Sequence, residues 1–341
     1  MNAFRYFRIF AGRPTLVLSL TILFLGGLTL LEGPVPIDVY TLLSILGHLI
    51  GLPTHHYTRE TYAIVTELRL LSIVSVLISG AALGLSGAVM QSLLRNPLAD
   101  PSLLGISSSA GLGVVIAALC FGITQVWIPT IAALTGSLIG VILLYALSRH
   151  WTSGGSLKLI LAGIALNALL NALSLFLISI ADTHILQSVF FWSLGGTSGI
   201  HWTTTGLAAI LTLIGSILLY RQASALNVLC LGECDAQSTG VDVRVLRILC
   251  VIGVAVSISA SVILTGPVAF VGLMVPHVLR AWVGPNPQKL IPVSGLGGAA
   301  LLLFAYWLSR QFQTVSDIPL GVVTALLGAP FFLGLLWKKQ A

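Results

Sequence analysis

Long apolar runs separated by short polar stretches dominate the hydropathy pattern of this chain. Most of these runs reach the roughly 20 residues that an α-helix needs to cross the hydrocarbon core of a bilayer. The pattern therefore predicts an all-α, polytopic membrane protein that forms one transmembrane domain over residues 1–341. The ten predicted spans cover residues 15–31, 63–94, 103–122, 126–147, 157–180, 202–220, 246–264, 268–282, 290–309 and 317–337.

The sharpest interruption of this pattern is a polar stretch at residues 91–101, Gln-Ser-Leu-Leu-Arg-Asn-Pro-Leu-Ala-Asp-Pro. Backbone groups left unpaired around its two prolines would find no water inside lipid, so the stretch is either a water-exposed turn or a break buried in protein. We expect Arg95, Asn96 and Asp100 to build a capped turn between the second and third spans rather than to contact a ligand.

Small and polar residues mark two helix faces inside the membrane. In the second span Gly80 and Gly84 predict close packing against a neighbouring helix. In the fifth span Asn167, Asn171 and Ser174 lie on one helix face, because they are spaced by four and three residues. Such a polar stripe either lines an aqueous path or bonds to neighbouring helices, and the sequence leaves both readings open.

Composition indicates a membrane protein, and the distribution of charge predicts its orientation in the membrane. The chain is 57% hydrophobic and 8% charged, whereas soluble domains carry roughly 25% charged residues. Its net charge of +6 comes from single basic residues scattered between apolar runs, so we expect no nucleic-acid partner. With both termini in the cytoplasm, all but Arg59, Arg69 and Arg310 of the 16 Lys and Arg residues fall on the cytoplasmic side.

Two polar loops hold candidate chemistry. The inner loop 221–245 predicts two short helices around a turn, the size of a docking element, with Gly232 and Gly240 at its turns. The outer loop 32–62 carries His48, His55 and His56. Histidines there are able to bind a metal or haem, but ordinary solvated side chains are the favoured reading.

Several chemistries find no support in the sequence. It contains no G-x-x-x-x-G-K-[ST], H-E-x-x-H or G-x-S-x-G motif, and its four cysteines show no metal-site spacing. We therefore expect no enzyme activity, no cofactor and no metal site in this chain. Uphill transport would need an energy-supplying partner or an ion gradient, and the near absence of carboxylates from span centres argues against the gradient.

Four stretches resemble, in family order, the permease subunits of binding-protein-dependent ABC importers for ferric siderophores, haem and vitamin B12 (the FecCD type). The first contains Leu-Arg-Asn-Pro-Leu-Ala-Asp-Pro-Ser-Leu-Leu-Gly, and the likeness runs from about residue 60 to the end. The four stretches are residues 86–105, 231–233, 266–277 and 317–330.

The resemblance implies a specific assembly in the bacterial inner membrane. Two permease subunits, identical or homologous, would enclose a path, and a cytosolic ATPase dimer would hold the inner loops. The segment 226–241 resembles the family's coupling helices, with Leu231, Gly232 and Glu233 at the motif. The family's cytoplasmic constriction corresponds to positions near Ser156 and Leu157, which we therefore place on the translocation path with Asn167, Asn171 and Ser174.

A periplasmic or lipid-anchored binding protein would deliver the cargo from outside. The family docks this protein through outward arginines, which correspond here to Arg69 and Arg310. One departure is clear, since the family motif Arg-Leu-Pro-Arg reads Arg-Leu-Leu-Ser at residues 69–72. Ferric siderophore is the first cargo that the resemblance implies, followed by haem and cobalamin; an ion-coupled secondary transporter is the alternative from another class.

Overall fold

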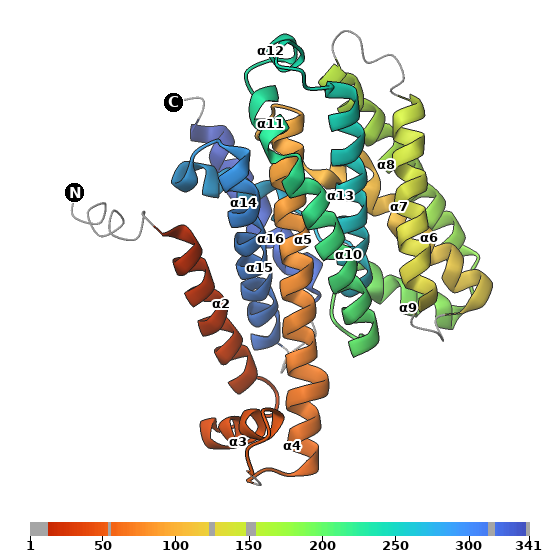
Figure 1. The fold of residues 1–341 in the computed structure, drawn as a ribbon. Helices are drawn as coiled ribbons and strands as arrows, with labels where there is room; N and C mark the ends of the chain where they lie inside the picture. Colours follow the sequence, from red (N-terminus) through yellow and green to blue (C-terminus); the bar gives the residue numbers. More distant parts are fainter. Residues whose placement is uncertain (1–12, 54–55, 123–126, 148–154, 313–317, 339–341) are drawn as a thin grey trace.

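The computed structural model describes residues 13–53, 56–122, 127–147, 155–312 and 318–338, and every regular element in these ranges is helical. Figure 1 shows an upright bundle with a small helical lobe beyond one end. The predicted all-α architecture is therefore confirmed.

Within the described ranges, seven helical stretches are long and apolar enough to cross a membrane. They lie in α2 (Pro14–Leu31), α4–η1–α5 (Arg59–Leu93), α7 (Trp127–Leu147), α8 (Gly155–Ser179), α10 (Trp202–Arg221), α13 (Val243–Thr265) and α15 (Pro287–Gln311). The second stretch runs for 35 residues through a π-helical segment, η1 (Ile64–Leu70). At 1.5 Å per residue it is about 52 Å long, which exceeds the roughly 30 Å hydrocarbon core of a bilayer.

Three further helices coincide with the remaining predicted spans. They are α6 (Ile106–Phe121), α14 (Val271–Val283) and α16 (Leu320–Lys338), and their apolar stretches are shorter than the seven above. The 13 residues of α14, which include Pro276, agree with the short eighth span expected from the sequence.

The main segment of the long helix, α5 (Leu71–Leu93), is the central element of the bundle and packs against α10, α13, α14 and α15. Its glycines allow backbones to touch, as the sequence predicted. A methyl group at Gly80 or Gly84 would overlap carbonyl oxygens of α15, and one at Gly87 would overlap the carbonyl of Gly272 in α14. In lipid, such close packing takes the place of the hydrophobic drive that assembles soluble proteins.

The two longer outer loops contain helices that the sequence analysis did not predict. Within 32–62 lies α3 (Val39–Leu49), and within 181–201 lies α9 (Thr183–Ser193). The side chain of Asp38 caps α3 by accepting a 2.9 Å hydrogen bond from the Thr41 N–H. Hydrogen bonds from Thr41 also lower the pKa of the Asp38 carboxyl. Both helices have only 11 residues, too few to register as spans.

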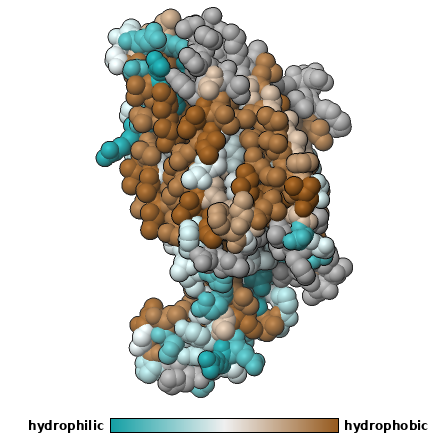
Figure 2. All heavy atoms as spheres, turned by 90° about the vertical axis from the view of Figure 1, so that its right-hand side faces the viewer, coloured by the Kyte–Doolittle hydropathy of each residue, from teal (hydrophilic) through white to brown (hydrophobic). Residues whose placement is uncertain are grey.

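On the face shown in Figure 2, a wide band of apolar side chains crosses the bundle, with polar residues gathered toward its two ends. Helices at the edge of the bundle expose large apolar side chains, for example Phe24 on α2 and Phe176 on α8. Such a band is the surface that lipid covers, so the chain is a multi-pass membrane protein.

The end of α16 lies at the upper end of the bundle in Figure 1, and α2 runs downward from about the level of the middle of α5. Two short helices, α11 (Ala223–Leu229) and α12 (Glu233–Ser238), project from the upper end as well. The inner loop thus contains the two helices and the turn that its sequence predicts. The lobe with α3 and α4 lies beyond the opposite end.

The glycine contacts of α5 yield a stability prediction. Gly84→Ala should destabilise the protein by about 1–3 kcal/mol, because the new methyl group pushes α5 away from α15. Gly206→Ala in α10 is the matched control, since nothing lies within 4 Å of a methyl group there. Thermal unfolding in detergent measures both variants, and equal unfolding temperatures for the two would contradict the packing account.

Candidate functional site

The segment that projects from the inner loop has a buried base and an exposed tip. Leu226 and Leu229 of α11 and Ala236 of α12 are buried against the bundle. Leu231, in the turn between the two helices, is 76% exposed. The segment therefore presents a large apolar side chain at its tip.

Glycines shape both turns of this segment. Gly232 has φ +153°, and a side chain there would press on the Asp235 carboxylate. Gly240, at φ +86°, ends α12 in a Schellman motif, in which Gly240 N–H donates to Gln237 O and Val241 N–H donates to Ala236 O, both at 3.0 Å. The tip is therefore presented by a defined backbone.

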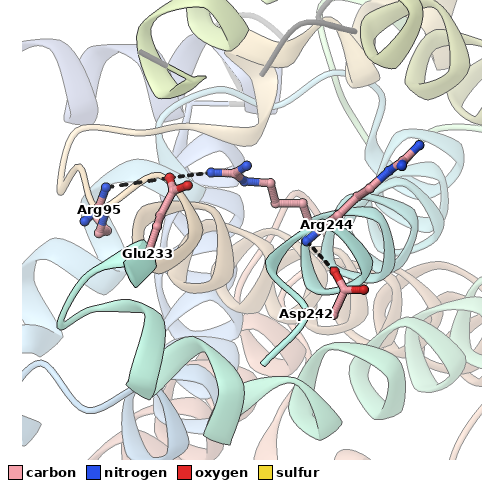
Figure 3. Close-up of polar contacts among 5 residues, drawn as sticks. Arg95, Glu233, Asp242 and Arg244 are labelled. Carbon is pink, nitrogen blue, oxygen red and sulfur yellow. Dashed lines mark hydrogen bonds and ion pairs between the residues drawn. The ribbon is translucent and has the colours of Figure 1, made fainter. Parts of the chain in front are cut away.

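Glu233 joins the projecting segment to the bundle (Figure 3). Its Oε1 accepts a 2.5 Å hydrogen bond from Nη2 of Arg247 in α13 and lies 3.8 Å from Nη2 of Arg95. Nearby, the Asp242 carboxylate caps α13 by accepting from Arg244 N–H at 2.9 Å and Val245 N–H at 3.1 Å. The carboxylate of Glu233 thus links α12 to the next helix, α13, and to Arg95 at the distant inner end of α5.

The polar stretch 91–101 forms the turn between α5 and α6, as the sequence predicted. Asn96 accepts a 2.9 Å hydrogen bond from Leu98 N–H, and Asp100 caps the short helix η2 (Pro101–Leu104) by accepting from Ser102 N–H at 2.6 Å. Burial raises the pKa of the Asp100 carboxyl, against the opposing effect of the Ser102 hydrogen bonds. Asn96 and Asp100 therefore serve the architecture of the turn.

Gln91 at the inner end of α5 also ties this turn to α14. The side chain is buried and donates through Nε2 to Leu273 O at 3.0 Å. Its Oε1 accepts from Nη2 of Arg280 at 2.9 Å. The inner end of α5 is therefore connected to α14 by the Gln91 amide and to α12 by the ion pair of Arg95 with Glu233.

At the opposite end, Arg69 and Arg310 come together beside a cavity of about 360 Å³. Arg69 of η1 is only 1% exposed and donates hydrogen bonds to the backbone carbonyls of Leu30 and Val35. Arg310 is half-buried and lies 5.7 Å from the ring centre of Tyr306. Gly33 lies against both guanidinium groups, where any side chain would collide with them.

The segment over these arginines is held on α15. Glu32 Oε2 accepts hydrogen bonds from Trp307 Nε1 and Gln311 Nε2, both at 2.8 Å. Among the described residues, no carboxylate pairs with either arginine, and both Nε atoms are buried without a hydrogen-bond partner. Glu67 also lines this cavity, so its wall carries two cations and one carboxylate and keeps an excess of positive charge.

The predicted polar stripe of α8 divides into two environments. Asn167 is half-buried; its Oδ1 accepts a hydrogen bond from the Ser108 hydroxyl, and its Nδ2 donates to Ser102 O at 3.3 Å. Ser174 donates back to Leu170 O within its own helix. Asn171 is exposed on the single subunit. Ser156 and Leu157 belong to the first turn of α8, and their side chains lie outside the described part of the chain.

The outer histidines do not form a metal site in the described residues, where no cluster of three metal-ligating side chains occurs. His48 contacts Tyr57 and Tyr62 edge-on, and His56 lies beside Tyr40. His55 lies outside the described residues.

Three residues that complete these sites do not stand out in the sequence. Arg247 is one of several scattered basic residues there, but in the structure it is the closest partner of Glu233. Gln91 and Arg280 are 189 residues apart and meet only in the folded bundle. A signal was present for Gln91, since a buried amide inside an apolar segment needs partners.

Comparison with known proteins identifies the family of transport proteins that this chain resembles. The FecCD transport family matches residues 20–338. The hemin transport system permease HmuU of Yersinia pestis is 39% identical over 285 residues, 80% of this chain and 83% of its own length. The vitamin B12 import system permease BtuC of Yersinia enterocolitica is 36% identical over 315 residues, 91% of this chain and 93% of its own.

Solved structures agree with this class. An inward-facing metal-chelate type ABC transporter superposes with a TM-score of 0.82 at 29% identity, covering 95% of this chain and 98% of that one. PsaBC from Streptococcus pneumoniae, at 17% identity and a TM-score of 0.56, shares the fold alone. The architecture is that of an importer permease, a transport component and not an enzyme. This chain belongs to the FecCD transport family.

The two amides of α8 give a paired prediction. Asn167→Leu should destabilise the protein by about 1–3 kcal/mol, because Ser108 and the Ser102 carbonyl lose their partner. Asn171→Leu should leave the unfolding temperature unchanged and slow transport. Asn171 is exposed, forms no side-chain hydrogen bond with the described residues, and is expected on the path. Unfolding in detergent and uptake into vesicles measure the two effects, and equal destabilisation by both variants would contradict this division.

Proposed function

We propose that this chain is the permease subunit of an ATP-driven, binding-protein-dependent importer that carries a ferric siderophore inward by alternating access. The family match over residues 20–338 is the observation that carries this proposal. Ferric siderophores are the first cargo implied by the sequence resemblance. Haem and cobalamin are the alternatives, supported by the similarity to a hemin permease and to vitamin B12 permeases.

The proposed orientation places ten spans in the bacterial inner membrane with both termini in the cytoplasm. Two observations support it. The end of α16 lies on the side from which α11 and α12 project, and α2 runs away from that side toward the outer lobe (Figure 1). The excess of Lys and Arg also falls on that side, as expected for cytoplasmic segments.

The segment 226–241 is proposed to receive the motion of a cytosolic ATPase dimer. Leu231 supplies the exposed tip, Gly232 the backbone that presents it, and Glu233 the connection to the bundle. This division of roles follows from their contacts in the folded chain. The energy for transport then comes from ATP bound in the partner, whereas a secondary transporter would work alone on an ion gradient.

The translocation path is proposed to form between this subunit and a second permease, identical or homologous. Support comes from α8, which exposes most of its length on the single subunit and carries Asn171 on its surface. Ser156, Leu157 and Ser174 of the same helix would join it, with Asn167 acting mainly in packing. Weakly polar walls suit a cargo that has to leave as readily as it enters.

Arg69 and Arg310 are proposed to dock a periplasmic or lipid-anchored binding protein through its carboxylates. The cavity beside them and the lack of a carboxylate partner in the described residues support this role. The two arginines differ in exposure and therefore in proposed role. Arg310 is the more accessible cation and meets the partner, whereas Arg69 mainly holds the segment containing Leu30 and Val35 in place.

Transport measurements on the complete importer test the cargo and the energy source. The permease, its ATPase and its binding protein are reconstituted in vesicles and supplied with a radio-iron hydroxamate siderophore, haemin or cyanocobalamin. We expect ATP-dependent uptake of the siderophore. Uptake of haemin or cyanocobalamin alone would replace the cargo with that alternative, and uptake driven by an ion gradient without the ATPase would refute the importer mechanism.

Charge reversal tests the docking site. Arg310→Glu should weaken binding-protein affinity by more than about tenfold, because a carboxylate of the partner would then meet a like charge. Surface-immobilised permease in nanodiscs allows this affinity to be measured. Arg59→Glu, an exposed reversal in the outer lobe, is the matched control. Equal effects of the two reversals would indicate general electrostatic attraction instead of a defined docking site.

A further inference from the structure

The carboxylate of Glu233 is directed into the permease and not away from it (Figure 3). One of its oxygens lies between the guanidinium groups of Arg247 and Arg95. The side chain of Arg247 is only 14% exposed and that of Glu233 is 38% exposed. A pair this close with one member largely buried is shielded from salt better than an exposed surface pair.

Arg95 occupies a backbone position that normally selects glycine. The helix α5 ends in a Schellman motif, in which Arg95 N–H donates to Ser92 O at 3.2 Å and Asn96 N–H donates to Gln91 O at 3.1 Å. Arg95 is the left-handed residue of this motif, with φ +49°. Glycine adopts that conformation without strain, so an arginine there must be explained by its side chain.

The side chain of Arg95 is 42% exposed and reaches the projecting segment, where its Nη2 lies 3.8 Å from Oε1 of Glu233. Arg95 extends from the inner end of α5, the central helix, toward Glu233 at the start of α12. Arg247 extends from α13, which packs directly on α5. Glu233 is thus the point where the projecting segment is bonded to two adjacent helices of the core.

We propose that Arg95 and Arg247 are positioning residues that hold Glu233, so that motion imposed on the Leu231 tip passes into α5 and α13. This proposal rests on the proposed function, because it assumes that an ATPase grips the tip. In the alternative role, Glu233 would itself contact the ATPase. Leu231 makes the contact, and Glu233 transmits the displacement.

The arrangement of the core makes this connection effective. A displacement of Arg95 moves the inner end of α5, which packs against α10, α13, α14 and α15. Gln91, four residues earlier, carries the same displacement to α14 through Leu273 O and Arg280. The network is contiguous and joins rigid helices, as energetic coupling between distant sites requires.

The test uses the complete importer in vesicles and records three quantities: ATPase association, ATP hydrolysis, and cargo moved per ATP, with the radio-iron siderophore as probe or whichever cargo the wild type proves to carry. Glu233→Gln should keep the ATPase bound and lower cargo per ATP by about two- to thirtyfold. Asp235→Asn removes an equal charge from the same short helix and should behave as wild type. Leu231→Asp should instead release the ATPase.

Arg95→Gly is the most informative variant, because it should change the cargo moved per ATP without lowering the unfolding temperature. Glycine relieves the left-handed backbone strain, so the unfolding temperature should stay level or rise while cargo per ATP falls. The double variant Glu233→Arg with Arg247→Glu restores one ion pair with reversed polarity and should recover part of the coupling lost by Glu233→Arg alone.

Each result decides between the two roles of Glu233. Release of the ATPase by Glu233→Gln would assign the carboxylate to the partner contact and overturn the proposal. Full coupling in Arg95→Gly, or equal losses in Asp235→Asn and Glu233→Gln, would overturn it as well. Wild-type vesicles that show no ATP-dependent uptake would instead refute the proposed function, a failure visible before any variant is compared.

Discussion

The close approach of α5 to α14 and α15 is the contact on which the rest of the structure depends. Gly80, Gly84 and Gly87 bring backbone against backbone along one side of the central helix. Lipid offers no hydrophobic drive for helix association, so the bundle relies on this short-range packing. Once α5 is seated, its two ends are fixed in space, and each end carries one of the polar sites.

The two sites differ in how their charges are balanced. At the inner end, Arg95, Arg247 and Arg280 are met by one carboxylate and one amide, which bond the projecting segment and α14 to the central helix. At the outer end, Arg69 and Arg310 have no carboxylate partner in the described residues. The inner arrangement is therefore suited to transmitting force within the chain, and the outer one to receiving an anionic group from elsewhere.

Arg69 shows how tertiary structure changes the reading of a single residue. In the sequence it is a basic residue on the wrong side of the membrane, which suggests an exposed contact. In the structure the segment from Leu30 to Val35 covers it and takes its hydrogen bonds. Its partners are backbone carbonyls about 35 residues away, which no local pattern reveals. The helices α3 and α9 escaped prediction for a related reason, because segments of 11 residues fall below the length that marks a span.

The sequence by itself determined the membrane class, the long apolar helices, the close-packing face of α5, the two short inner helices and the family. These properties follow from length, hydropathy, glycine spacing and charge, all of which are local or cumulative along the chain. The tertiary structure decided which polar groups meet: Glu233 with Arg95 and Arg247, Gln91 with Arg280, Asn167 with Ser108. Apolar spans pack through shape and leave few sequence marks of their neighbours, so these pairings exist only once the helices are assembled.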